Sequence, residues 1–225
     1  MYQVIANEAD FIVISKSANV HFHSQDGSAG VVAQAELDLG IKLYAVHRLD
    51  TLTSGLIILA KSPAAAAEFT RQFSEHQVQK YYLALAQGKP KKKQGWVIGD
   101  MAKSRRSMHK LLRTTVNPAV TQFFSQSVGD GLRLYLLKPL SGKTHQLRVA
   151  LASIGVPILG DELYGGQASD RGYLHAYSLN FNYKNQAYQF SSLPQTGAAF
   201  SRDEVLQQLN VWQKPDSLNW PKAKS

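Results

Sequence analysis

A glycine-aspartate-glycine turn that joins two apolar segments limits most strongly what this chain can fold into. The turn, at residues 129–131, separates residues 120–128 from residues 132–137. Such a turn between two strand-like segments is a strong signal for a β-hairpin. A second hairpin is indicated where apolar and polar residues alternate over 179–183, ahead of a Lys-Asn turn. The two hairpins together predict a largely antiparallel sheet.

Helix signals occur at fewer places than strand signals. A helix is expected over residues 29–39, and Ser62 followed by Pro63 predicts a helix start with serine as the N-cap. Ser201 and Glu204 have the spacing of a capping box, which predicts a C-terminal helix over residues 201–213. Its single apolar face is formed by Val205, Leu206, Leu209 and Trp212. Short apolar runs predict further strands at residues 11–14, 44–46, 56–60 and 80–85.

No repeat and no linker rich in Gly, Ser or Pro divides the chain. Because strands outnumber helices and hairpins recur, we predict an α+β fold with a largely antiparallel mixed sheet flanked by helices and loops. A chain of 225 residues can bury a sizeable core. We therefore assign residues 1–225 to a single domain that ends in an irregular tail, residues 214–225.

The composition excludes several kinds of chemistry. The sequence has no cysteine, which rules out a thiol nucleophile, an iron–sulfur cluster, cysteine-ligated zinc and disulfides. No apolar run approaches the roughly 18 residues that a membrane-spanning helix needs, and the N-terminus lacks the pattern of a signal peptide. We expect a soluble, cytoplasmic protein without a membrane partner.

Most of the formal charge of +9 comes from one segment, residues 87–118. This segment has nine basic residues and one acid, Asp100; the basic residues are Lys89, Lys91, Lys92, Lys93, Lys103, Arg105, Arg106, Lys110 and Arg113. A charge run alone often marks only a solvated face. Here apolar and aromatic residues are interleaved with the charges, a pattern that suits a nucleic-acid backbone with bases nearby.

The run Ser-Gly-Lys-Thr at residues 141–144 looks like the end of a phosphate-binding P-loop. That loop needs a glycine with four residues between it and Gly142, but Leu137 stands there, and Pro139 offers no amide to a phosphate. Nucleotide hydrolysis is therefore disfavoured. The apolar spacing predicts a helix that begins near Thr144 and is capped by Gly155, with an apolar face of Leu147, Ala150, Leu151 and Ile154. Lys143, His145 and Arg148 lie in or beside its first two turns.

A second chemical stretch reads HRLDTLTSG, from residue 47 to residue 55, between two apolar runs. Asp50 lies in this polar turn, where an isolated aspartate most often forms an Asx-turn or caps the loop. Loops held between rigid strands also carry catalytic residues. A carboxylate paired with an arginine stays ionised at neutral pH and can act as a nucleophile.

The stretch HRLDTLTSGLIILAKS resembles the signature of RluA-type RNA pseudouridine synthases. Three further blocks are similar to motifs of this family and follow in the same order: KYYLAL from Lys80, GKTHQLRVAL with GVPILGD and Tyr164-Gly165, and a late Leu174-His175-Ala176. The resemblance covers about residues 10–194. Several long motifs in order are far more specific than any one of them.

The resemblance implies catalytic roles for three residues. Asp50 is the expected nucleophile, which attacks the uridine at the sugar C1′ or at the base so that uracil can turn and form a C1′–C5 bond. Tyr82 is expected to lie against the uracil, while its neighbour Tyr81 better suits a core position. Arg148 is expected to pair with Asp50 and to keep it charged. This reaction needs no redox step, metal or nucleotide energy source, so no cofactor is expected.

RNA contacts are also implied. A uridine in folded RNA must leave its stack to reach a loop carboxylate. The resemblance suggests that Arg48 fills the vacated space beside His47 and that Leu147 packs beneath the base; further expected contacts come from Thr53, Lys143, His145, Lys103, Arg105 and Arg106. In another reading, Arg48 forms a structural ion pair.

The chain departs from the family pattern in places. The segment at residues 16–23 has serine and asparagine where the family has proline and glycine, although asparagine tolerates a positive φ. Lys143 stands for an arginine and Ala150 for a histidine. His21 and His23 lack a third partner that would make a metal site. No segment matches the small S4-like RNA-binding domain of many relatives.

The sequence supports one main hypothesis and one alternative. The main hypothesis is an isomerase that converts specific uridines of rRNA or tRNA to pseudouridine, acting as a monomer. The alternative is a non-catalytic RNA-binding protein or RNA chaperone. The trio of Asp50, Tyr82 and Arg148 favours the enzyme, because binding alone does not need it.

Overall fold

A computed structural model describes residues 1–25, 27 and 29–222 of the chain. The chain forms two compact units: unit 1 consists of residues 1–80 and 175–195, and unit 2 consists of residues 81–174 together with the chain from residue 196 onward. Both units combine strands with helices, which confirms the predicted α+β class with its mostly antiparallel mixed sheet. The assignment of one catalytic domain to residues 1–225 stays a prediction.

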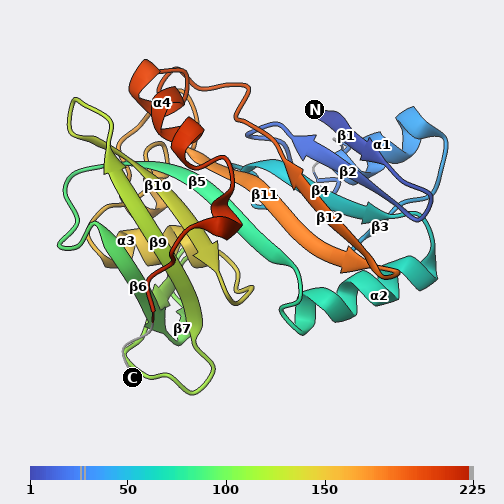
Figure 1. The fold of residues 1–225 in the computed structure, drawn as a ribbon, viewed down its shortest axis with the longest axis horizontal. Coiled ribbons are helices and arrows are strands. Elements are labelled where there is room, and N and C mark those ends of the chain that lie inside the picture. Colours follow the sequence, from blue (N-terminus) through green and yellow to red (C-terminus); the bar gives the residue numbers. More distant parts are fainter. Residues whose placement is uncertain (26, 28, 223–225) are drawn as a thin grey trace. The chain divides into compact units, whose positions relative to one another are not determined.

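Unit 1 is built on a sheet in the order β1-β2-β4-β11, with β12 beside β11 and β3 beside β4 (Figure 1). β4 and β11 run parallel, whereas the other strand pairs of this unit are antiparallel. The elements are β1 (Tyr2–Asn7), β2 (Phe11–Lys16), α1 (Val31–Leu39), β3 (Tyr44–Ala45), β4 (Ser54–Ala60), α2 (Pro63–Ser74), β11 (Leu174–Tyr183) and β12 (Gln186–Ser191).

The core of unit 1 lies between its sheet and α2. Phe69 of α2 meets Phe11 of β2 edge-on and stacks on Tyr183 of β11. Leu56 and Ile58 of β4 complete this core and are fully buried. β4 is buried along its whole length, so its N-terminal end, where the polar turn leads in, has a fixed position.

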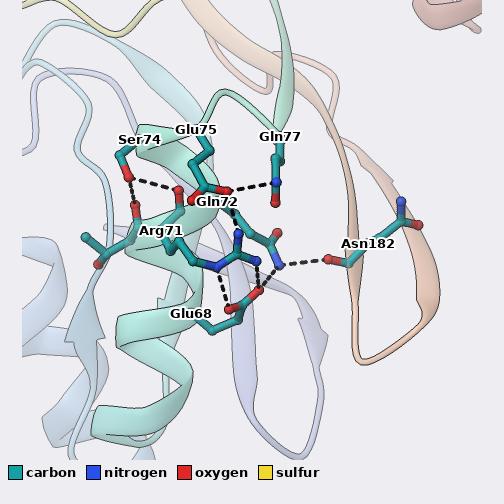
Figure 2. A network of polar contacts seen from close by, with 8 residues as sticks. Glu68, Arg71, Gln72, Ser74, Glu75, Gln77 and Asn182 are labelled. Carbon is teal, nitrogen blue, oxygen red and sulfur yellow. Dashed lines mark hydrogen bonds and ion pairs between the residues drawn. The ribbon is translucent and has the colours of Figure 1, made fainter.

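A polar network fixes the last turns of α2 (Figure 2). Arg71 pairs with Glu68 and Glu75 on the same helix. The buried amide of Gln72 donates to Glu68 and to the carbonyl of Asn182 near the end of β11, at 2.7 and 2.9 Å. The C-terminal end of α2 is thereby held to the β11–β12 hairpin.

Unit 2 contains an antiparallel sheet in the order β5-β10-β9-β6 and a separate two-stranded sheet, β7-β8. Helix α3 lies against β8, β9 and β10. The elements are β5 (Gln79–Gln87), β6 (Gln94–Gly99), β7 (Met101–Lys103), β8 (His109–Leu111), β9 (Ala119–Ser127), β10 (Leu132–Pro139), α3 (Gln146–Ser153), η1 (Glu162–Tyr164), α4 (Asp203–Val211) and η2 (Pro215–Ser217).

Both hairpins are confirmed. All three residues of the turn at 129–131 have a positive φ, of 82°, 49° and 73°, and so do Lys184 and Asn185 between β11 and β12. The N-cap of α2 is confirmed as well, because the Ser62 hydroxyl accepts a hydrogen bond from the Ala65 amide at 3.2 Å. Helix α1 begins two residues later than expected, at Val31.

The predicted capping box is wrong. Arg202 is the N-cap of α4 and no side chain caps the helix, while the Ser201 hydroxyl donates to the Gly197 carbonyl and Glu204 lies in the first helical turn. Acidic side chains there favour the helix through its macrodipole. Leu206 is 44% exposed, so it does not belong to the buried face of Val205, Leu209 and Trp212.

Two further segments differ from expectation. Strand β1 was not predicted, because half of its residues are exposed, none is fully buried and it lacks a clear apolar period. The tail is not wholly irregular: it includes η2, and the Trp220 ring lies 4.7 Å from Phe124 while its Nε1 donates to the Pro215 carbonyl at 2.7 Å. Residues 223–225 of the predicted tail lie outside the described part of the chain.

Candidate active site

Asp50 begins a tight turn that leads into β4. The Thr53 amide donates to the Asp50 carbonyl at 3.0 Å and closes the turn. Two residues later Gly55 has a φ of 108°, and a Cβ at this position would lie 2.2 Å from the Ala176 carbonyl oxygen of β11. Only glycine fits so close an approach of two backbones. The glycine of the HRLDTLTSG motif thus lets the start of β4 pair with β11, while Asp50 itself is half-buried.

A buried ammonium group braces this turn. Lys16, at the end of β2, is 1% exposed. Its Nζ donates to the carbonyls of Ser17, Val20 and Thr51 at 3.0, 2.8 and 3.1 Å. Thr51 directly follows Asp50, so Lys16 joins the candidate catalytic turn to the loop after β2. The sequence resemblance had assigned no role to this lysine.

The divergent segment at residues 16–23 keeps its turn. Asn19 has a φ of 58°, as expected for an asparagine that replaces a glycine. The segment then returns to the candidate catalytic turn, where His21 Nδ1 and the Thr51 hydroxyl are 3.2 Å apart. The substitutions at Ser17 and Asn19 therefore leave two links to Thr51 in place, one from Lys16 and one from His21.

A buried histidine holds the far end of the turn. His175 of β11 is 2% exposed; its Nδ1 lies 2.7 Å from the Ser54 hydroxyl and its Nε2 lies 2.7 Å from the Ser192 carbonyl. A carbonyl only accepts, so Nε2 carries the proton, and in the neutral ring Nδ1 accepts from Ser54. The LHA motif thus supplies an anchor for the first residue of β4.

His47 has a structural environment. Its Nε2 accepts the amide hydrogen of Ile58 at 2.9 Å, and its ring stacks on Phe73 with a centroid distance of 4.3 Å. Burial, with a smaller effect from the Lys80 charge, lowers the pKa of His47 to about 3. The ring is therefore neutral at physiological pH and cannot contribute a positive charge to RNA binding.

Arg48 and Thr53, which flank Asp50 in the motif, differ in exposure: Arg48 is exposed and Thr53 is buried. The Arg48 side chain is exposed and has no hydrogen bond or ion pair with any residue in the described part of unit 1. Thr53 is 2% exposed. Arg48 is thus accessible to a ligand, whereas Thr53 forms part of the packed base of the turn.

In unit 2, successive residues of β5 face opposite sides of the sheet. Tyr81 is fully buried and lies 5.8 Å from the Trp220 ring, with Lys138 Nζ 5.7 Å from the Tyr81 centroid. This confirms the core position expected for Tyr81. Tyr82 is half-buried and lies opposite Leu137 of β10.

The loop before α3 is organised by Gln146 instead of by a bound phosphate. The Gln146 Oε1 accepts from the Ser141 hydroxyl and the Lys143 amide at 2.8 and 2.9 Å, and its Nε2 donates to Val120 and Thr121 on β9. The helix begins at Gln146, two residues later than expected, because His145 has a left-handed backbone with a φ of 57°. The expected C-terminal glycine is confirmed, since Gly155 has a φ of 81° and directly follows the C-cap Ile154.

Arg148 is held by an ion pair that the sequence reasoning missed. Its Nε and Nη2 each donate to one oxygen of Asp161, both at 2.7 Å, and the side chains are 6% and 1% exposed. The guanidinium also lies over the Tyr164 ring, with Cζ 4.9 Å from the centroid. Asp161 and Tyr164 belong to the GDELYG block at residues 160–165. The polar and aromatic residues of this block were the only sequence signal that pointed to partners for Arg148. The block orients Arg148.

The other expected residues near α3 are placed as follows. Leu147 is 7% exposed, and Lys143 Nζ donates to the Asn117 side chain at 2.9 Å. His145 Nδ1 lies 2.9 Å from the Tyr164 hydroxyl. Asp50 belongs to unit 1, whereas Tyr82 and Arg148 belong to unit 2. The pairing of Arg148 with Asp50 therefore stays a prediction.

The basic segment forms β6, the β7-β8 hairpin and the loops around them. Its one acid, Asp100, ties the base of this hairpin: its carboxylate accepts from the amides of Val116 and Asn117 at 3.0 and 2.8 Å. Hydrogen bonds, first from Thr114, lower the pKa of Asp100. Lys103, Arg105 and Arg106 are exposed and form no ion pair within the described part of unit 2.

Two general searches of the described residues gave no site of another kind. No group of three or more His, Asp or Glu side chains among them is placed to hold a metal ion. No helix in the described part of the chain is long and apolar enough to cross a membrane.

Comparison with known proteins decides the family. The sequence matches the family model described as RNA pseudouridylate synthase over residues 10–153. The chain is an RluA-type RNA pseudouridine synthase by family. Members of this family are isomerases, which confirms the predicted enzyme class.

Individual relatives agree with this assignment. An uncharacterized RNA pseudouridine synthase of Haemophilus influenzae is 47% identical over 213 residues, which cover 93% of this chain and 95% of that protein. The dual-specificity RNA pseudouridine synthase RluA of Escherichia coli is 37% identical over 147 residues, 61% of this chain and 66% of that protein. The solved structure of human RNA Pseudouridylate Synthase Domain Containing 1 has a TM-score of 0.76 at 25% identity and covers 99% of this chain and 97% of its own.

Proposed function

We propose that this pseudouridine synthase isomerises specific uridines of structured RNA, in rRNA or tRNA, with Asp50 as the nucleophile. The observation that carries the proposal is the bracing of the Asp50 turn. Lys16 and His21 hold Thr51, and His175 holds Ser54. Two of these braces are buried polar side chains, which are costly unless fully satisfied. Such an arrangement holds the backbone on the C-terminal side of Asp50 in one conformation, which supports a role in which this carboxylate must be presented in a fixed place, as nucleophilic catalysis requires.

The chemistry balances within the nucleotide. The N1–C1′ bond breaks, the uracil turns, C1′ bonds to C5, the C5 proton goes to solvent and N1 gains a proton. Asp50 attacks either C1′ or the base to make the cleavage possible. The C–O bond that it forms breaks again as pseudouridine is completed, which returns the carboxylate to its starting state. Because no electron acceptor, metal or nucleotide energy source enters this balance, the reaction calls for no cofactor.

Arg148 is proposed to keep Asp50 ionised and aligned. Asp161 accepts from Nε and from one hydrogen of Nη2, so pairing with a second carboxylate would use the other edge of the guanidinium, through Nη1 and the second hydrogen of Nη2. An arginine already held by a buried bidentate pair keeps a fixed orientation, which preorganises the site. Tyr82 is proposed to contact the uracil ring, and Leu147 to pack beneath it.

RNA binding is proposed to rest on the exposed basic side chains. Lys103, Arg105 and Arg106 contact phosphates, and Lys143 and His145 contribute at the start of α3. Arg48 is proposed to enter the stack that the target uridine leaves. For His47 we propose an indirect role: its neutral ring, fixed by Phe73 and the Ile58 amide, orients the turn that carries Arg48 and Asp50.

The decisive experiment measures tritium release from cellular RNA labelled at uridine C5. Isomerisation predicts release, because the C5–H bond is lost. Binding of RNA without release from any rRNA or tRNA fraction would instead support the alternative of an RNA-binding protein or RNA chaperone. Mapping pseudouridines in cells with and without the gene then identifies the RNA.

A further inference from the structure

The hydroxyl of Tyr164 joins two separate elements of unit 2. It accepts the backbone amide hydrogen of His109, the first residue of β8, at 2.8 Å. It also lies 2.9 Å from Nδ1 of His145, the N-cap of α3. A hydroxyl has one hydrogen and two lone pairs, so it can make both bonds at once.

The ring of Tyr164 reaches a third group. The Arg148 guanidinium lies over it, and Arg148 is paired with Asp161 at the start of the same 3-10 turn. One side chain thus contacts the basic hairpin through its hydroxyl and the proposed catalytic arginine through its ring. Removal of the hydroxyl alone would break the first contact and keep the second.

The hairpin that Tyr164 holds has a defined shape of its own. β7 and β8 pair only with each other among the described strands, and the tip carries Arg105 and Arg106. Arg106 and Ser107 have left-handed backbones with φ of 53° and 60°, a conformation that costs energy for residues other than glycine. Two backbone hydrogen bonds close the tip: the Ser104 amide donates to the Met108 carbonyl at 2.8 Å, and the Met108 amide donates to the Arg105 carbonyl at 3.0 Å. Its orientation relative to α3 is set partly by the Tyr164 hydroxyl.

We propose that Tyr164 is a positioning residue that couples phosphate binding by the β7-β8 hairpin to the alignment of Arg148. The inference rests on the proposed RNA-modifying function. RNA that binds Arg105 and Arg106 would favour one orientation of the β7-β8 hairpin against α3. The Tyr164 hydroxyl links this hairpin to His145, and the Tyr164 ring contacts Arg148, so the orientation of the hairpin affects the alignment of Arg148. The coupling requires the hydroxyl, since the ring alone does not bond to β8.

The test uses Tyr164→Phe, which keeps the ring beneath Arg148, and Tyr2→Phe as a control that removes an exposed hydroxyl bonded to Asp38. Hydrogen exchange of the His109 amide should speed up about tenfold in Tyr164→Phe and stay unchanged in the control. Affinity for poly(U), which probes backbone binding, should fall about five- to tenfold. Turnover of C5-labelled RNA should show a lower kcat as well as a higher KM.

A double-mutant cycle separates coupling from a general structural role. If Tyr164 acts through the hairpin, its loss should have little further effect on poly(U) affinity in an Arg105→Ala/Arg106→Ala background. The proposal would be overturned if Tyr164→Phe lowered poly(U) affinity by the same factor in this background as in the unmodified protein. It would also be overturned if the His109 exchange rate were unchanged in Tyr164→Phe. In the unmodified protein, poly(U) should slow His109 exchange, and an unaltered rate there would also overturn it. None of the binding and exchange results depends on Asp50, so they stand apart from the test of the proposed reaction.

Discussion

Asp161 holds both Nε and Nη2 of Arg148 at 2.7 Å in a pair that is almost wholly buried. The geometry is bidentate, and the Tyr164 ring covers the guanidinium. A buried pair of this kind need not add net stability, because two charges lose their hydration. Its value here is that Arg148 has one orientation and keeps its charge.

Replacement of Asp161 by Asn should therefore be costly. The amide has the same shape but leaves a buried guanidinium without its countercharge, which should lower the free energy of unfolding by about 3–5 kcal/mol. Urea unfolding followed by circular dichroism measures this loss. The exposed pair of Arg202 and Asp130 offers a control, since Asp130→Asn should cost at most about 1 kcal/mol. Equal small losses in both variants would contradict the role assigned to Asp161.

Lys16→Met should loosen the Asp50 turn. The variant keeps the length of the side chain but leaves the carbonyls of Ser17, Val20 and Thr51 without the ammonium, at about 1–3 kcal/mol for each one that stays unsatisfied. Because Lys16 braces the turn that carries Asp50 and does not contact the basic β7-β8 hairpin proposed to bind the RNA backbone, kcat for tritium release should fall more than KM rises. Lys184→Met, which removes an exposed pair with Asp10, is the matched control. A change in KM alone would argue against this brace.

The motifs could be read from the sequence, but their supports could not. The hairpins at 129–131 and 184–185 and the N-cap Ser62 are local features, fixed by residues close together in the chain. The contacts of Lys16 with Thr51 and of Arg148 with Asp161 join residues far apart, so no local pattern reveals them. The predicted capping box failed because a tertiary contact competed: Arg202 pairs with Asp130 and the helix begins one residue after it.

Acid should destabilise the protein through His47. Folding lowers its pKa from 6.5 to about 3, so between these values the unfolded chain binds a proton that the native ring does not. The stability contribution is complete above pH 6.5 and is lost as the pH falls towards about 3, by at most about 1.4 kcal/mol per pH unit. The gap in unfolding free energy between the unmodified protein and His47→Phe should therefore shrink from pH 7 to pH 5. A gap that stays constant would mean that His47 does not titrate this way.

Arg48→Ala should distinguish folded from unfolded RNA. If Arg48 fills the space that a flipped uridine leaves, its contacts offset part of the few kcal/mol that unstacking costs. Without them flipping becomes less favourable, and kcat/KM on folded RNA should fall about tenfold or more. A loose single strand has less stacking to lose and should be affected less. Arg202→Ala should change neither substrate. Equal losses on both substrates with Arg48→Ala would contradict the insertion role.

The most direct test of the account is Asp50→Asn, assayed for tritium release from C5-labelled RNA alongside RNA binding. The amide keeps the size of the side chain and its place in the turn closed by the Thr53 amide, but it is not a nucleophile. The account predicts that release is abolished while RNA affinity and the unfolding midpoint stay close to those of the unmodified protein. Release by Asp50→Asn at an undiminished rate would show that another group carries the reaction.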